Sequence, residues 1–287
     1  MLSPTGARDR ALAPRFGTLS HSLEIETMDQ PLIEALGDEL YAALRGCSVV
    51  EPLTNRHADI TIADAYRIQQ RMLARRLEAG ERVVGKKIGV TSAAVMNMLG
   101  VYQPDFGYML DGMIVAQGES IAMSTLIQPK AEGEIAFILK RDLMGPGLSN
   151  ADVLSATECV MPCFEIVDSR IRDWKIKIQD TVADNASCGV FVLGDNAVDP
   201  RRVDLFTCGM VLEKNGEIIA TGAGAAALGS PVNAVAWLAN TLGRLGIPLK
   251  AGEVVLSGAL ATMFPAKAGD NFRVTIGGLG GCSVRFH

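Results

Sequence analysis

Two apolar segments of the chain carry acidic residues that any fold must bring toward its interior. Glu132 and Glu134 directly precede the run 135–139, and Glu165 lies within the segment 161–167. The run 135–139 lacks polar alternation, which is typical of a β-strand covered on both faces. Because side chains alternate along a strand, Glu132 and Glu134 share one face. The sequence therefore predicts two strands that carry carboxylates into a core.

Buried carboxylates that lie close together need a positive partner. An unpaired buried carboxylate is costly, and neighbouring like charges raise each other's pKa. A divalent cation is the simplest partner. The chain has only three histidines, and His21, His57 and His287 all lie far from the glutamates in the sequence. Ligation by oxygen alone favours Mg²⁺ or Mn²⁺ over zinc or copper.

The same spacing has a simpler explanation. Glu132 and Glu134 would then line the solvated face of an edge strand and pair with Lys130 or Lys140. Spacing alone does not decide between this arrangement and a metal site, so the neighbouring sequence has to be considered.

Five short segments supply that context. In order along the chain they are Gly-Lys-Lys-Ile-Gly-Val-Thr at 85–91, Gln-Pro-Asp-Phe-Gly at 103–107, Glu-Gly-Glu at 132–134, Ser-Arg-Ile-Arg-Asp-Trp at 169–174 and Asp-Thr-Val-Ala-Asp-Asn-Ala-Ser-Cys-Gly at 180–189. Together they resemble the 2-hydroxypenta-2,4-dienoate hydratases (2-oxopent-4-enoate hydratases) of the fumarylacetoacetate hydrolase family. The resemblance spans roughly residues 83–286. It implies an α+β fold, in which a mixed β-roll or barrel-like catalytic domain follows an amino-terminal helical region.

The resemblance also implies roles for residues at matching positions. The implied ligands of Mg²⁺ or Mn²⁺ are Glu132, Glu134 and Glu165. The other implied active-site residues are Lys87, Asp105 and Ser187. Lys87 would balance charge or act as an acid, and Asp105 would hold or exchange a proton with it. Ser187 would donate a hydrogen bond to a substrate carboxylate, since no histidine is available to make it a nucleophile.

The activity implied by the resemblance is metal-dependent hydration of 2-hydroxypenta-2,4-dienoate to 4-hydroxy-2-oxopentanoate in the meta-cleavage catabolism of aromatic compounds. One alternative is the 4-oxalocrotonate decarboxylase of the same family. Another is a subunit that mainly supports such a partner decarboxylase in a complex. A carbon–carbon hydrolase of the wider family is disfavoured, because those members activate water with a histidine and this chain offers none near the site.

Composition excludes several kinds of partner. The net charge of −5 argues against nucleic acid and anionic membranes as general partners. No apolar stretch reaches the ~18 residues of a membrane span, and no secretory signal is visible, so we expect a cytoplasmic protein. We also expect a homo-oligomer.

The six cysteines are scattered, which predicts reduced, buried thiols rather than disulfides, and Cys188 lacks a base that would make it a nucleophile.

Periodicity divides the chain into three parts. Residues 1–27 have no periodicity and are predicted to be a flexible tail, with Met28 as a plausible alternative start. Residues 28–82 form the predicted helical region, with helices near 32–44 and 62–79. Residues 83–287 form the predicted β-rich catalytic domain, including a strand at 83–90, short helices from 92 to 99 and near 150, and a helix at 231–245. Asn215-Gly216 between apolar runs predicts a hairpin.

Several charged residues receive structural predictions. Strand parity places Lys86 on the face opposite Lys87, where we expect solvent to surround its charge. The arginines of the stretch 71–82 are predicted to line a solvated helix face. Arg170 and Arg172 are predicted to pair with Asp168 or Asp173.

The small-residue segment 222–227 is not predicted to bind a nucleotide. It follows a hairpin instead of opening a βαβ unit, and no acidic residue lies about 20 positions further on, as a dinucleotide site would require.

Overall fold

The amino-terminal helices form where the periodicity predicts them. The computed structural model describes residues 28–93, 96–97 and 100–287. Its first helices are α1 (Gln30–Arg45), α2 (Leu53–Arg56) and α3 (Ile62–Glu78). The Asp29 side chain caps α1 by accepting a hydrogen bond from Leu32 N, and Thr61 and Asp64 form a capping box at α3. The predicted tail 1–27 and residues 94, 95, 98 and 99 of the predicted helix 92–99 lie outside the described residues.

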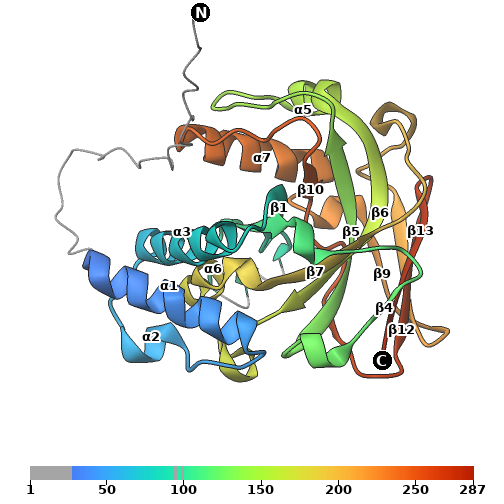
Figure 1. The fold of residues 1–287 in the computed structure, drawn as a ribbon. Helices are drawn as coiled ribbons and strands as arrows, with labels where there is room; N and C mark the ends of the chain where they lie inside the picture. Colours follow the sequence, from blue (N-terminus) through green and yellow to red (C-terminus); the bar gives the residue numbers. More distant parts are fainter. Residues whose placement is uncertain (1–27, 94–95, 98–99) are drawn as a thin grey trace, which may run out of the picture.

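A large curled sheet forms the centre of the molecule. In spatial order its described strands are β2 (Asp105–Leu110), β1 (Val83–Gly89), β10 (Val254–Leu256), β5 (Pro129–Leu139), β6 (Thr157–Asp168), β7 (Cys188–Leu193) and β3 (Ile114–Val115), and β11 (Phe264–Pro265) also pairs with β5. The glutamate-bearing strands β5 and β6 are thus its long central strands (Figure 1). This position contradicts the alternative of an edge strand with a solvated acidic face.

A second sheet packs against the first. Its described strands, in spatial order, are β4 (Ser120–Ile121), β13 (Gly280–Phe286), β12 (Asn271–Ile276), β8 (Gly209–Lys214) and β9 (Glu217–Ala223). Asn215-Gly216 forms the predicted β8–β9 hairpin turn. The backbone of Gly133 in β5 approaches this second sheet so closely that a Cβ there would lie 2.9 Å from Met210 and Val274. A glycine between Glu132 and Glu134 therefore lets the two sheets pack on the face opposite the carboxylates.

The remaining helices flank the large sheet. They are α5 (Asn150–Ala156), α6 (Ile178–Ala183) and α7 (Pro231–Arg244). Figure 1 shows α1, α3 and α6 grouped on one side of the sheet, with α7 beside α5 at one end. The predicted α+β class with a barrel-like sheet and amino-terminal helices is confirmed. No helix in the described part of the chain has the length and apolar character needed to cross a membrane.

Lys86 is buried, which corrects the expectation that it is solvated. It does lie on the face of β1 opposite Lys87, but only 2% of it is exposed. Its Nζ lies 2.6 and 2.8 Å from the two carboxylate oxygens of Glu253, the residue before β10, and 5.9 Å from the centre of the Tyr108 ring. Parity gives the face of a strand correctly, but it does not show what covers that face.

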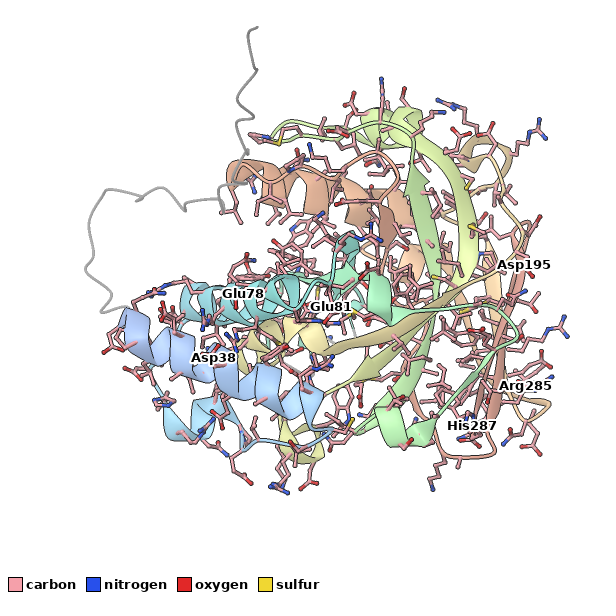
Figure 2. The ribbon with its side chains drawn as sticks, in the orientation of Figure 1. Asp38, Glu78, Glu81, Asp195, Arg285 and His287 are labelled. Carbon is pink, nitrogen blue, oxygen red and sulfur yellow. The ribbon has the colours of Figure 1, made fainter. Side chains whose placement is uncertain are left out.

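Two further predictions are corrected on the helices and loops. Arg76 of α3 is 7% exposed and pairs with Glu81, so the arginine-rich stretch is only partly solvated. Figure 2 shows Glu81, Asp38 and Glu78 around the helices, and Asp38 and Glu78 also lie within salt-bridge distance of arginines of α3.

The cysteines are free thiols as expected, yet Cys47 is exposed because it lies just after the end of α1.

Candidate metal centre and active site

Pairing of β5 with β6 brings the three glutamates together. The antiparallel register sets Glu132 directly opposite Glu165, and Glu134 follows two positions later on the same face. One carboxylate oxygen from each residue lies within 4.8 Å of the others. Glu134 and Glu165 are only 1% and 0% exposed, whereas Glu132 is partly exposed and lines a cavity. Three acids thus converge in a largely buried space.

Protein donors satisfy the carboxylate oxygens of this cluster only in part. Gly258 N donates a hydrogen bond of 2.8 Å to Glu134 Oε2, and the Lys87 ammonium forms an ion pair with Glu165 Oε1, but among the described residues none hydrogen-bonds to Glu134 Oε1 or Glu165 Oε2. Burial, reinforced by Glu165, raises the pKa of Glu132 to about 7 and that of Glu134 well above its ordinary value. Unsatisfied, mutually repelling oxygens fit a hard divalent cation that accepts oxygen ligands.

Lys87 and Asp105 lie beside the glutamates. Lys87 is 3% exposed, and its Nζ lies 3.1 Å from Glu165 Oε1 as an ion pair. Burial lowers the pKa of Lys87, but the charges of Glu165 and Asp105 outweigh this and raise it above the ordinary value. The Asp105 backbone pairs with Gly89 across β1 and β2, and burial raises the pKa of its carboxyl to about 6 although Lys87 opposes the shift. The site therefore joins a fixed positive charge to a carboxyl that titrates near neutrality.

A cavity of about 80 Å³ gives access to this cluster. Its polar lining includes Lys87, Asp105, Glu132 and Ser187. Trp174 and other apolar side chains form much of the remaining wall, namely Val90, Val167, Ile176 and Met263. The Ser187 hydroxyl lies 3.3 Å from that of Thr181 on α6. The structure thus brings all six residues implied by the resemblance to one site, while the described histidines, His57 and His287, do not line the cavity.

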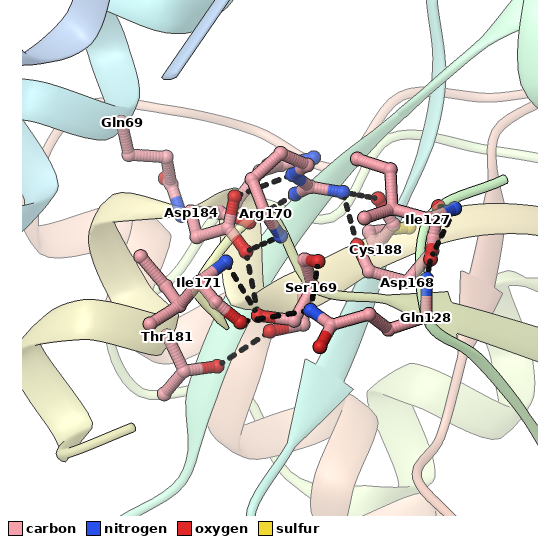
Figure 3. A network of polar contacts seen from close by, with 12 residues as sticks. Gln69, Ile127, Gln128, Asp168, Ser169, Arg170, Ile171, Thr181, Asp184 and Cys188 are labelled. Carbon is pink, nitrogen blue, oxygen red and sulfur yellow. Dashed lines mark hydrogen bonds and ion pairs between the residues drawn. The ribbon is translucent and has the colours of Figure 1, made fainter. Parts of the chain in front are cut away.

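A buried ion pair holds the loop that carries Ser187. Arg170 pairs with Asp184, and its guanidinium also donates to the backbone oxygens of Asp168 and Cys188 (Figure 3). This corrects the predicted pairing of Arg170 with Asp168 or Asp173. The Asp168 carboxylate instead accepts hydrogen bonds from the backbone N–H groups of residues 127 and 128.

Arg172, in the same loop, also differs from its prediction. Its partner is Glu51, on the segment between α1 and α2, and the pair is exposed at the surface. Neither Glu51 nor Asp184 is near its arginine in sequence, so adjacency in the chain gave the wrong acid in both cases.

Arg170→Met is expected to lower the free energy of unfolding by about 3–5 kcal/mol, because it leaves Asp184 charged and buried without its partner. Arg172→Met is the matched control. Its pair with Glu51 is about half exposed, so the loss should stay within about 0.5 kcal/mol. Urea unfolding followed by circular dichroism measures both, and equal losses would show that burial does not matter at Arg170.

Three supporting residues were not singled out from the sequence. Asp184 and Thr181 lie inside the segment 180–189, which was noted as a motif, but nothing in the sequence showed that Asp184 faces Arg170. Gly258 had no local signal, because its contact with Glu134 joins positions that are 124 residues apart. Long-range contacts of this kind depend on the sheet order.

Comparison with known proteins agrees with this architecture. The family model for the fumarylacetoacetate hydrolase carboxy-terminal region matches residues 92–287. A 2-hydroxypent-2,4-dienoate hydratase of Pseudomonas putida is 72% identical over 221 residues, which is 77% of this chain and 100% of the relative. A 2-hydroxyhexa-2,4-dienoate hydratase of Comamonas testosteroni is 57% identical over 260 residues, which is 90% of this chain and 98% of the relative.

A solved structure gives the same result for the fold. The 4-oxalocrotonate decarboxylase from Pseudomonas putida G7, complexed with magnesium and adipate, superposes with a TM-score of 0.88 at 38% identity and covers 91% of this chain and 99% of that one. Its identity to this chain is well below that of the two hydratases. The chain therefore belongs to the fumarylacetoacetate hydrolase family and is a hydro-lyase of the hydratase type.

Proposed function

We propose that this enzyme hydrates 2-hydroxypenta-2,4-dienoate (2-oxopent-4-enoate) to 4-hydroxy-2-oxopentanoate in the meta-cleavage catabolism of aromatic compounds, with Mg²⁺ or Mn²⁺ as cofactor. The observation that carries the proposal is the convergence of three largely buried glutamates, whose oxygens are only partly satisfied by protein donors, beside Lys87 and a cavity. The names of the similar hydratases support the reaction type and the substrate class.

Glu132, Glu134 and Glu165 would hold the cation. When bound, it supplies positive charge that attracts the 1-carboxylate and 2-oxygen of the substrate and stabilises negative charge on that oxygen. The fit rests on the donor set, because the described residues offer three converging carboxylates and no nitrogen or sulfur ligand among them.

The protein's own residues would orient the substrate and move protons. Ser187 donates a hydrogen bond to the substrate carboxylate, and apolar walls such as Trp174 surround the diene. In the first stage the 2-hydroxyl loses its proton and a proton is added to the terminal carbon, C5, so that the dienol becomes a 2-oxo-3-enoate. In the second stage water adds to C4 and a proton adds to C3. Asp105, whose pKa of about 6 suits proton exchange near neutrality, is the group positioned to carry these protons, and the fixed positive charge of Lys87 balances the negative charge that develops.

Removal of divalent metal is expected to abolish turnover, and added Mn²⁺ or Mg²⁺ should restore it. Loss of the ultraviolet absorbance of the dienol measures the rate in chelated, metal-free and metal-restored enzyme. Full activity after exhaustive chelation would contradict the metal assignment, because the buried carboxylates would then act without a cation.

The related decarboxylase activity is the second candidate. It is favoured by one observation, the close superposition on a 4-oxalocrotonate decarboxylase, whereas the greater identity to hydratases favours hydration. Assaying both substrates with the same preparation separates the two activities. We further propose that the protein is a cytoplasmic homo-oligomer and forms a complex with such a decarboxylase, which copurification from cells that express both chains would test.

A further inference from the structure

Ser187 lies at the end of an unusual turn. Asn185, Ala186 and Ser187 have φ angles of 54°, 50° and 52°, so three consecutive residues other than glycine adopt the left-handed conformation. L-residues disfavour this conformation, and it occurs mainly at single positions. Such a turn persists only where surrounding contacts hold it.

The Asn185 side chain supplies those contacts. Its Oδ1 accepts a hydrogen bond of 2.8 Å from Tyr108 N, and its Nδ2 donates one of 2.9 Å to Tyr108 O. Tyr108 belongs to β2, the strand at the edge of the large sheet. The amide of Asn185 therefore pairs with the free edge of β2 in the way that another strand would.

A second amide and a glycine complete the attachment. Gln69 of α3, 0% exposed, donates 2.9 and 3.0 Å hydrogen bonds to the backbone oxygens of Phe106 on β2 and Val182 on α6. Gly107 lies between the two anchored residues of β2. A Cβ at Gly107 would lie only 2.4 Å from the Asn185 backbone oxygen, so only glycine permits this approach. The turn is thus fixed against the sheet edge that begins with Asp105.

We propose that Asn185 is a positioning residue that directs the Ser187 hydroxyl into the active-site cavity by attaching the left-handed turn to the edge of β2. Asn185 itself does not line the cavity, whereas Ser187 and Ala186 do. The inference rests on the proposed function only through the role of Ser187 in binding the substrate carboxylate.

Two variants of Asn185 and a matched control test the proposal, together with Ser187→Ala. Asn185→Ala removes both hydrogen bonds, and Asn185→Gly removes them while making the left-handed φ easy to adopt. The matched control is Asn215→Ala in the β8–β9 hairpin, where another asparagine has a φ of 55° and bonds to Asn271 N and Asp270. This control measures the general cost of replacing a left-handed asparagine away from the cavity.

The main measurement is the affinity of Mn²⁺-loaded enzyme for 2-oxopentanoate, an unreactive 2-oxo acid, by calorimetry. We expect Asn185→Ala and Asn185→Gly each to weaken binding by about 10-fold, as Ser187→Ala does, and Asn215→Ala to leave it unchanged. In the Ser187→Ala background, Asn185→Ala should add less than about 2-fold, because both changes remove the same interaction. Wild-type affinity in Asn185→Gly, or fully additive losses, would overturn the proposal.

A crystal structure of Asn185→Ala separates this inference from the proposed function. If the wild-type enzyme neither binds the 2-oxo acid nor hydrates the dienoate, the proposed function fails. The position of Ser187 in the crystal structure of Asn185→Ala still shows whether Asn185 positions Ser187. A Ser187 that leaves the left-handed region and turns away from the cavity supports it. A Ser187 in its original place, without the Asn185 amide, overturns it.

Discussion

Glu134→Gln is expected to lower turnover by about 10³-fold or more while leaving the metal-free protein at least as stable as the wild type. The loss follows because the amide removes one anionic ligand from a site built of three. Stability is retained because burial and the neighbouring acids raise the pKa of Glu134 well above its ordinary value, so the neutral amide resembles the protonated acid. Gly258 N can still donate to the remaining carbonyl oxygen.

The measurements are the dienol assay, Mn²⁺ binding by calorimetry and thermal unfolding without metal. Glu158→Gln is the matched control, since Glu158 lies on β6 with Glu165 but is 64% exposed at its side chain. That variant should match the wild type in all three. Wild-type Mn²⁺ affinity in Glu134→Gln would remove Glu134 from the ligand set.

Lys87→Met is expected to lose turnover, whereas Lys86→Met is expected to lose stability, although the two residues are adjacent. Lys87→Met should lower turnover by about 10²–10⁴-fold with a much smaller change in affinity for 2-oxopentanoate, because its positive charge acts mainly as negative charge develops during the reaction. Lys86→Met should lower the free energy of unfolding by about 3–5 kcal/mol, because it leaves Glu253 buried without its cation. Its folded fraction should retain near-normal turnover.

A double variant separates the two effects. Lys86→Met combined with Glu253→Met replaces the buried ion pair with apolar side chains, and it should recover much of the stability lost by Lys86→Met alone. Denaturant unfolding measures the recovery, and the dienol assay measures turnover in the same preparations. If Lys86→Met abolished turnover without loss of stability, the assignment of Lys87 to the site would be wrong by one residue.

The sequence predicted those features that depend on local pattern. Period-two alternation placed Glu132 and Glu134 on one face of a strand, helical periodicity located α1 and α3, and the Asn215-Gly216 pair located the β8–β9 hairpin. The family resemblance then selected six site residues, which the structure brings together. Their chemical roles stay predictions until the variants above are measured.

Features that depend on sheet order could not be predicted in this way. Lys86 is buried because β10, more than 160 residues further along the chain, runs parallel to β1 and brings Glu253 to its ammonium. Arg170 pairs with Asp184 because the intervening loop folds back, while the nearer Asp168 is occupied by backbone donors. Short-range charge patterns cannot distinguish such partners from sequence neighbours.

Glu132 and Glu165 lie opposite each other on the neighbouring strands β5 and β6, and this pairing affects which strand register is stable during folding. A slip of one residue between β5 and β6 would turn Glu165 toward the side where Phe164 now meets Phe272, and would drive a carboxylate into that aromatic contact. The native alignment lets both acids share one cation, whereas the one-residue slip separates them. A divalent ion present during refolding would thus stabilise the native pairing of β5 and β6 over a pairing shifted by one residue.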